Sequence, residues 1–243
     1  MAELFLDFCG CCDEEVILDA GCGTGALTAA ILRRTNSARI SGIDFSAPYV
    51  EHARQTIPDT RAQFSVGDIC ALPQDGSSFD RVLSLLVLHF VPEPDKAIAE
   101  LRRVARPGAT VGAAVWDSGG LVAYRMFFDT AGALFPNGNE QRARNFTWPM
   151  TRPGELAKAW QACGLADVRD TMLTIRMEFA SFDDYWMPYA GKDGPGAQYM
   201  ATLNSDQKEH LRNVVRIAYL SGEPDGPRSY AATAWAVRGT VPV

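Results

Sequence analysis

The sequence is short of positive charge: 23 Lys and Arg stand against 29 Asp and Glu, a net charge of −6. A chain without a basic face offers little to a phosphate backbone, so we expect no nucleic-acid partner. Long apolar runs are also missing, because the longest, "RVLSLLVLHFV" (81–91), is too short to span a bilayer. Glu3 and Asp7 stand where a secretory or transit leader would be basic, so we expect a cytoplasmic protein without a transmembrane segment.

Clusters of residues that bind metals are scarce as well. The three histidines are scattered, and the cluster "CGCC" (9–12) has no second Cys or His group at ligand spacing. We therefore expect no metal site. The six cysteines are expected to be reduced thiols, because a chain of 243 residues that is 47% hydrophobic can bury a full core without covalent cross-links.

The first half of the chain alternates short apolar runs with helical patterns, which is typical of a parallel sheet wrapped by helices. Strands are predicted at 15–20, 38–44, 62–68, 79–87 and 109–116. Helices are predicted from Thr24, from Ser46 as a cap, and at 95–106 before Pro107-Gly108.

The regular alternation stops after Asp117, where aromatic residues and glycines indicate an inserted helical segment. Later elements are predicted as helices at 153–163, 181–190 and 205–220, with "GKDGPG" between the last two, and strands within 167–179 and 229–239. We expect one structural domain of the α/β class. Along the chain it consists of a core at 1–117, an inserted cap at 118–152, a core helix and strand at 153–180, a helical cap at 181–228 and a final core strand at 229–243.

The stretch "VILDAGCGTGALT" (16–28) places a glycine-rich turn between the first strand and the first of these helices. Read from Gly21, it fits the G-x-G-x-x-A form of the dinucleotide fingerprint. Read from Asp19, it fits a D-x-G-x-G-x-G pattern instead. The glycines do not separate the two, since any cofactor that approaches such a turn closely needs residues without a side chain.

Three carboxylates follow three successive strands and distinguish the two interpretations. Asp19, Asp44 and Asp68 lie at carboxyl ends of strands, where open parallel sheets bind their ligands. Asp44, about twenty residues past the glycines, suits ribose hydroxyls in either case. Asp19 would repel a pyrophosphate but attract an ammonium or sulfonium group, and Asp68 can accept from an amine such as adenine N6. The pattern favours an adenosine cofactor that is cationic near Asp19.

With these residues, the sequence resembles the class I S-adenosylmethionine-dependent methyltransferases, specifically the small-molecule branch with the ubiquinone and menaquinone C-methyltransferases and the methyltransferase type 11 domain. The motifs that carry this resemblance, in order within residues 5–117, are "VILDAGCGTGALT", "SGIDFS", "VGDICALP", "FDRVLSLLVLHFVP" and "ELRRVARPGATVGAAVW". The resemblance implies a Rossmann-like doubly wound sheet of seven strands, mostly parallel with an antiparallel last strand, and a helical cap made by insertions. Such enzymes usually carry a further helix or two before the first strand, which only some fifteen residues precede here.

The resemblance also implies S-adenosyl-L-methionine as cofactor, with S-adenosyl-L-homocysteine as product. The first turn would hold the methionine end, the acid after the second strand the ribose, the acid after the third strand the adenine amine, and main-chain groups of the fourth strand the amino group. The implied cofactor-binding residues are Asp19, Gly21, Cys22, Gly23, Asp44, Phe45, Gly67, Asp68, Ile69, Ser84 and Leu85.

Aromatic residues of the two irregular segments are candidates for the acceptor pocket, although most are expected to form the core of the cap. The predicted pocket residues are His89, Trp116, Tyr124, Trp148, Tyr185 and Trp186. Direct displacement needs alignment more than a base. For a hydroxyl or acidic carbon, the candidate bases are, in order, His89, Asp117 and Tyr124; His89 also fits an ordinary buried histidine at a helix start.

The expected function is methyl transfer to an O, C or N of a small, partly apolar molecule, by a monomer or homodimer. Two alternatives stay open. The chain could bind S-adenosylmethionine without catalysis, since no side chain is clearly catalytic. An NAD(P)-dependent oxidoreductase is the other alternative, against which Asp19, Asp68 and the late antiparallel strand pair argue.

Overall fold

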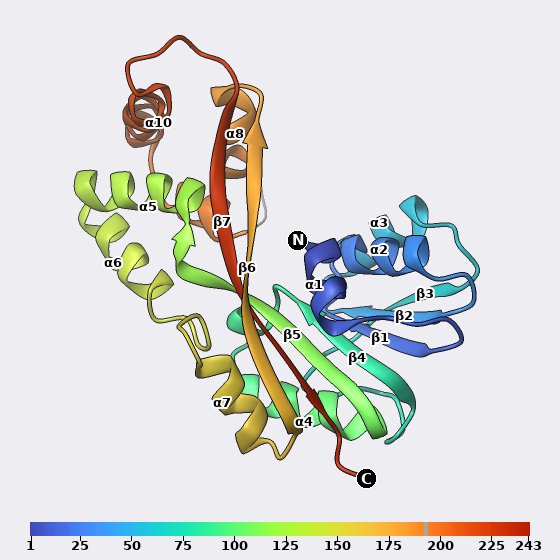
Figure 1. Cartoon of the computed structure of the whole chain (residues 1–243). Helices are drawn as coiled ribbons and strands as arrows, with labels where there is room; N and C mark the ends of the chain where they lie inside the picture. The colour runs from blue at the N-terminus through green and yellow to red at the C-terminus, as the bar shows by residue number, and fades with distance from the viewer. Residues whose placement is uncertain (192–193) are drawn as a thin grey trace. The chain divides into compact units, whose positions relative to one another are not determined.

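The computed structural model of the chain describes residues 1–191 and 194–243, which divide into two compact units (Figure 1). Unit 1 consists of Met1–Asp117, Pro149–Leu173 and Ala234–Val243. Unit 2 consists of Ser118–Trp148 and Thr174–Thr233.

The strands form a seven-stranded sheet in the order β3-β2-β1-β4-β5-β7-β6. Their bounds are β1 (Val16–Ala20), β2 (Arg39–Asp44), β3 (Ala62–Val66), β4 (Phe79–Leu85), β5 (Ala105–Leu121), β6 (Ala166–Phe179) and β7 (Arg228–Thr240). The pairs from β3 to β5 are parallel. The final strand runs the other way, since Gly108 N donates to Val241 O and Val241 N donates to Ala109 O. The predicted mostly parallel sheet with an antiparallel last strand is confirmed.

Different helices of unit 1 cover the two faces of the central strands. These helices are α1 (Ala2–Cys9), α2 (Ala26–Arg34), α3 (Ala47–Thr56), α4 (Pro94–Val104) and α7 (Glu155–Ala162). In β1, Ile17 packs in the cluster of α1 and α2, whereas Leu18 packs in the cluster of α4 and α7. Successive side chains of a strand point to opposite faces, so a strand covered on both sides is apolar throughout.

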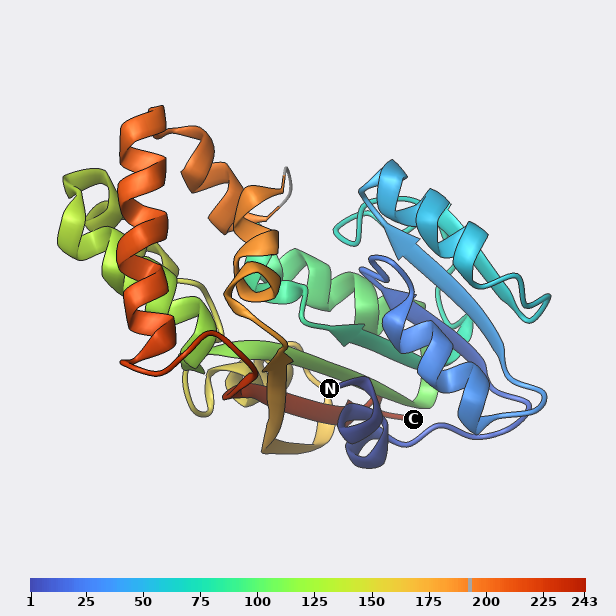
Figure 2. The same cartoon turned by 90° about the horizontal axis from the view of Figure 1, so that it is seen from above.

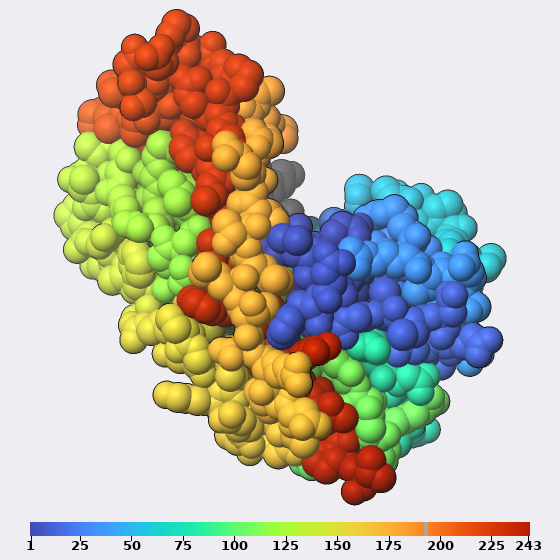
Figure 3. Space-filling model, viewed as in Figure 1, coloured from blue at the N-terminus to red at the C-terminus, as the bar shows by residue number. Residues whose placement is uncertain are grey.

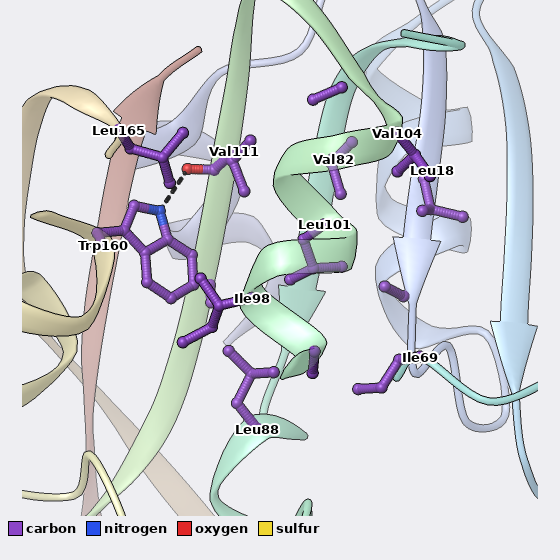
Figure 4. Packing of buried hydrophobic residues seen from close by; sticks show 14 of the residues in the cluster. Leu18, Ile69, Val82, Leu88, Ile98, Leu101, Val104, Val111, Trp160 and Leu165 are labelled. Carbon is purple, nitrogen blue, oxygen red and sulfur yellow. Dashed lines mark hydrogen bonds between the residues drawn. The ribbon is translucent and has the colours of Figure 1, made fainter. Parts of the chain in front are cut away.

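Helix α4 shows how the sequence pattern becomes packing. Pro94 stands in its first turn, and its apolar face is formed by Ala97, Ile98, Leu101 and Val104, which are all buried. Figure 4 shows this face within a cluster that also contains Trp160 of α7. The indole nitrogen of Trp160 donates to the Val111 carbonyl at 3.0 Å, so a buried polar group is satisfied where α7 meets β5.

Several boundaries differ from the prediction. The fourth strand ends at Leu85 rather than 87, because Leu86 has φ +64° and turns the chain into the short 3₁₀ helix η1 (Leu88–Phe90). The helix predicted to reach 106 ends at Val104, because Ala105 already pairs with Phe79 of β4. β5 therefore begins earlier than 109, and it also continues beyond 116.

Two helices are absent from the prediction, α1 and α9 (Pro195–Ala201). α1 buries Phe5, Leu6 and Cys9 against the sheet face that α2 also covers. α9 begins within the stretch "GKDGPG" (191–196), which the sequence predicts as a break; residues 192 and 193 of that stretch lie outside the described residues.

Unit 2 is built around aromatic side chains. Its helices are α5 (Val122–Leu134), α6 (Pro136–Asn145), α8 (Phe182–Ala190), α9 and α10 (Ser205–Leu220). Its aromatic cluster consists of Phe127, Phe128, Phe182, Tyr185, Trp186, Tyr189, Tyr199 and Tyr219. The rings of Phe127 and Tyr189 stack with centroids 4.0 Å apart. Figures 1 and 2 both show α10 beside α5.

The strand β6 lies at the edge of the sheet, and Figure 3 shows it in orange at the molecular surface. Most of its residues are exposed or half-buried, and only Leu173 is buried. Across residues 1–191 and 194–243, no helix combines the length and the apolar character that crossing a membrane requires.

Candidate functional site

The glycine-rich turn after β1 is fixed to the end of β2. Gly21 N and Cys22 N both donate to Ile43 O, at 2.7 and 2.9 Å. Gly21 has φ +77°, and a Cβ built on it would lie 2.5 Å from Cγ2 of Val87. A side chain is therefore excluded here both by the backbone conformation and by the lack of space. Gly23 has φ +52°, but a Cβ there would meet nothing within 4 Å.

Asp44, at the end of β2, holds this turn against the start of α3. Its Oδ2 accepts from Gly23 N and its Oδ1 accepts from Ser46 N, both at 2.9 Å. The side chain is buried, yet it lines a cavity. Each carboxylate oxygen can accept a further hydrogen bond, so Asp44 is oriented by the backbone and still able to receive hydroxyl donors.

Asp19, within β1, is almost completely buried, with 1% of its surface exposed. Its Oδ2 accepts from the Thr28 hydroxyl at 2.7 Å and from Thr28 N at 3.1 Å. Its Oδ1 has no hydrogen-bond partner among the described residues. Burial raises the pKa of this carboxyl to about 6, and Asp44 adds a smaller effect in the same direction. A buried carboxylate with one free oxygen is suited to a positively charged ligand group.

Asp68 follows β3 on an exposed turn, where its Oδ1 accepts from Cys70 N at 2.8 Å. Phe45 is 82% exposed, and Ile69 is buried. All three residues line the same cavity as Asp44. The structure thus places two carboxylates and two apolar side chains around one space, a combination that suits a polar, flat ligand.

This cavity has a volume of about 540 Å³ and lies within unit 1. Its walls are Gly21, Asp44, Phe45, Gly67, Asp68, Ile69, Cys70, Val87, Phe90, Val91, Pro92 and Glu93. The ends of β1, β2 and β3 and the segment after β4 supply these residues, so the cavity opens at the carboxyl edge of the parallel strands, as the sequence predicts. In the described part of the chain, its lining contains carboxylates but neither lysine nor arginine.

Six of the predicted cofactor residues meet at this cavity: Gly21, Asp44, Phe45, Gly67, Asp68 and Ile69. Others stand outside its walls. Cys22 packs with Phe64 and Val50, and burial raises the pKa of its thiol, so it behaves as a small apolar side chain. Ser84 is fully buried within β4, with no partner for its hydroxyl among the described residues, and Leu85 packs toward the face of α1 and α2.

The segment from Val87 to Glu93, together with Cys70, is the part of the cavity that the sequence prediction missed. The apolar run "RVLSLLVLHFV" predicts an uninterrupted strand through Val87, which hides the turn at Leu86. Because of that turn, Val87 packs against Gly21, and Phe90 stays half exposed at the cavity wall. The two prolines at 92 and 94 are the signal in the sequence that the strand had already ended.

The candidates for catalysis fall in both units. His89 lies in η1, buried in unit 1, with its ring centroid 3.9 Å from that of Phe90. Burial lowers its pKa to about 3, so the imidazole is neutral at ordinary pH. Asp117, half-buried beside Trp116 in β5, accepts from the indole nitrogen of Trp235 at 3.2 Å.

The remaining candidates belong to unit 2. The ring of Tyr124 lies 6.1 Å from that of Trp148, and burial raises the pKa of its hydroxyl, which has no partner among the described residues. Tyr185 and Trp186 are buried in the aromatic cluster, where the Tyr185 hydroxyl donates to Ala123 O at 2.9 Å. Their contact with an acceptor stays a prediction. Throughout residues 1–191 and 194–243, no three His, Cys, Asp or Glu side chains are grouped to hold a metal ion.

Comparison with protein-family models matches residues 17–108 to the methyltransferase domain. A malonyl-[acyl-carrier protein] O-methyltransferase of Halorhodospira halophila is 26% identical over 230 residues, which are 92% of this chain and 75% of that protein. A demethylmenaquinone methyltransferase of Clavibacter sepedonicus is 38% identical over 98 residues, 40% of this chain and 39% of that protein. The chain thus spans less than half of the length of several curated relatives that it matches.

Solved structures share the fold. Phosphoethanolamine N-methyltransferase 2 of Haemonchus contortus, in complex with S-adenosyl-L-methionine, superposes with a TM-score of 0.64 at 15% identity, covering 100% of this chain and 52% of that one. At this identity, the likeness concerns the arrangement of helices and strands.

Proposed function

We propose that residues 17–108, which match the methyltransferase domain, bind S-adenosylmethionine as the class I methyltransferases do, and that the chain transfers a methyl group to an O, C or N of a small, partly apolar molecule. The cavity of unit 1 is the proposed cofactor site. The observation that carries this proposal is its charge: carboxylates line it, a further carboxylate lies buried at Asp19, and no cationic side chain of the described residues is in its wall.

Each carboxylate suits a different part of the cofactor. Asp19 Oδ1 is the proposed acceptor for the ammonium group, because it is buried and otherwise lacks a partner in the described part of the chain. Asp44 is the proposed acceptor for the ribose hydroxyls, because two backbone N–H groups already fix its orientation. Asp68 is the proposed acceptor for the adenine amine, with Phe45 and Ile69 as apolar walls for the ring.

When bound, S-adenosylmethionine supplies a methyl group that the positive charge on sulfur makes reactive. The chain has to align the acceptor atom with the methyl group and to exclude water. Alignment of the two reactants can lower the barrier by roughly 7 to 11 kcal/mol without a dedicated side chain. The apolar wall at Val87, Phe90 and Val91 suits the second task.

The acceptor is proposed to be small and partly apolar because the segments that the sequence predicts as a cap, 118–152 and 181–228, are rich in aromatic side chains. The name of one relative, a demethylmenaquinone methyltransferase, supports this class of substrate without choosing the atom. For acceptors that need a base, Asp117 and Tyr124 remain proposed alongside His89, whose lowered pKa makes its imidazole a weak base.

Two alternatives are weaker. A nicotinamide dinucleotide would place its pyrophosphate near Asp19, where like charges repel. Binding without catalysis remains the second alternative, and it is separated from the proposal by turnover alone. A monomeric or dimeric state and a cytoplasmic location belong to the same proposal; the six free cysteines suit a reducing compartment.

The test is a methyl-transfer assay with S-adenosylmethionine and a panel of quinones, phenols and small carboxylic acids, read by mass spectrometry of S-adenosylhomocysteine and of the methylated acceptor. We expect product that depends on one class of acceptor and that falls when Asp44 is replaced by Ala. Tight cofactor binding without transfer to any class would support the non-catalytic alternative instead.

A further inference from the structure

A second cavity of unit 1, with a volume of about 430 Å³, has the opposite charge character from the cofactor cavity. Its walls are Thr110, Asp167, Arg169, Arg238, Gly239 and Thr240, which we call the basic pocket. These residues come from β5, β7 and β6, which are neighbours in the sheet. Two guanidinium groups and two hydroxyls therefore face one space.

The alternation of the strands explains why these side chains converge. Arg238 and Thr240 are two residues apart on β7 and so point to one face of that strand, and on β6 Arg169 shares a face with Leu173, which packs in the same cluster as Ala236. Ala236, two residues before Arg238, packs with α1, which identifies the face. At the end of this face the strands carry polar side chains, and these line the basic pocket.

The two arginines differ from those nearby in lacking a carboxylate partner. Arg81, on the same face of β4, is held by Glu15 at 2.8 Å. Neither Arg169 nor Arg238 forms an ion pair within residues 1–191 and 194–243. In a chain with an excess of acidic residues, two unmatched guanidinium groups in one cavity are a local inversion of the charge.

Arg238 is also preoriented. Its guanidinium carbon lies over the ring of Phe8, a residue of α1, at 5.4 Å from the ring centroid. A cation–π contact of this kind does not use the N–H donors of the guanidinium as hydrogen bonds to another residue. The contact thus limits the freedom of the side chain and leaves its donors available, which lowers the entropy lost on binding an anion.

We propose that the basic pocket binds a small molecule bearing a phosphate or carboxylate group, held by Arg169 and Arg238 with hydrogen bonds from Thr110 and Thr240. Asp167 is the acceptor for a hydroxyl or amine on the same ligand. The site is separate from the cofactor cavity: Thr110 pairs with Arg81, early in β4, whereas the cofactor cavity takes Val87 and later residues, beyond the end of that strand. The proposal therefore does not depend on methyl transfer.

The experiment titrates the full chain with inorganic phosphate and, separately, with citrate, by calorimetry at constant ionic strength, with chloride as the reference anion. We expect saturable binding of at least one oxyanion, and its preference tells phosphate-bearing from carboxylate-bearing ligands. Arg169→Gln and Arg238→Gln should each weaken binding about tenfold or more, because each removes charge-assisted hydrogen bonds.

The matched control is Arg144→Gln, which removes the same charge from an exposed position of α6 and should leave binding unchanged. Thermal unfolding checks that the variants are folded. If Arg238→Gln loses stability together with its Phe8 contact, the anion affinity of Arg169→Gln still tests the proposal. The proposal is overturned if neither oxyanion binds better than chloride, or if all three variants weaken binding equally.

Discussion

The cofactor cavity of unit 1 and the aromatic cluster of unit 2 were both marked as functional by the sequence, and they are built differently. In the cavity, backbone N–H groups hold the carboxylates of Asp44 and Asp68 and leave acceptor capacity free. In the cluster, aromatic rings pack against one another, and the Tyr185 hydroxyl is consumed by Ala123 O. In a sequence, carboxylates at strand ends therefore predict a ligand site, whereas buried aromatic residues mainly predict a hydrophobic core.

Replacing Asp44 should give the largest effect. Asp44→Ala leaves Gly23 N and Ser46 N without their acceptor and removes the proposed ribose partner, so affinity for S-adenosylmethionine should fall about 100-fold. Calorimetry measures it. Asp170→Asn, which removes an exposed carboxylate of β6, is the control and should bind as the wild type does. A folded Asp44→Ala variant with an affinity within threefold of wild type would contradict the assignment.

Asp19→Asn should move stability and affinity in opposite directions. The folded pKa of about 6 lies above the ordinary 3.8, so the folded chain binds a proton that the unfolded chain has lost. The contribution of Asp19 to stability therefore falls as pH rises from about 4 to about 6 and stays lost above that range. At pH 7.5 the variant should be more stable by about 3 kcal/mol and bind the cofactor about tenfold more weakly.

The pH dependence of binding sharpens this prediction. A cationic ligand requires ionised Asp19, so wild-type affinity should rise as pH increases from 5 to 7, on the order of tenfold. In Asp19→Asn the same rise should be absent. Calorimetry in buffers of different ionisation enthalpy also reports the proton released on binding. An identical pH profile for both proteins would remove Asp19 from the site.

His89→Ala tests a buried side chain of unit 1 that belongs neither to the lining of the cofactor cavity nor to the aromatic cluster. The folded pKa of about 3 lies below the ordinary 6.5, so the unfolded chain binds a proton that the folded chain does not. Wild-type stability should fall by about 2 kcal/mol between pH 7 and pH 5 from this residue, and the variant should lack that slope in urea titrations. We expect turnover to persist, since the neutral ring is a weak base. A folded variant that binds cofactor but has lost turnover would instead make His89 catalytic.

Two tyrosines of unit 2 give the smallest expected effects. Tyr185→Phe leaves Ala123 O without its donor and should cost about 1 kcal/mol in the free energy of unfolding. Tyr124→Phe removes a buried hydroxyl that has no partner in the described part of the chain, so stability should stay the same or rise slightly. Neither change should alter cofactor affinity. A tenfold loss of cofactor affinity in either variant would contradict the claim that the aromatic cluster does not contribute to cofactor binding.

Much of unit 1 could be predicted from the sequence because its signals are local and repeated. β1 is apolar throughout since both of its faces are covered, and α4 repeats its apolar residues at helical spacing. Asp44 and Asp68 were predicted because they follow strands directly, and both line the cavity at that edge of the sheet.

What escaped prediction depends on single backbone conformations and on packing. The turn at Leu86 needs φ +64° in an apolar run that looks like a strand, so the wall from Val87 to Glu93 was not foreseen. α1 and α9 are short, and tertiary contacts rather than strong sequence signals hold them. The basic pocket combines three strands distant in the chain, which no local pattern reveals.

The most direct test of the account is calorimetric titration of the wild-type chain at pH 7.5 with S-adenosylmethionine, S-adenosylhomocysteine and NADH in parallel. Affinity for the sulfonium compound and its demethylated product, with no detectable heat from NADH, is the predicted result. Uptake of the pyrophosphate-containing dinucleotide in place of both adenosyl compounds would contradict it.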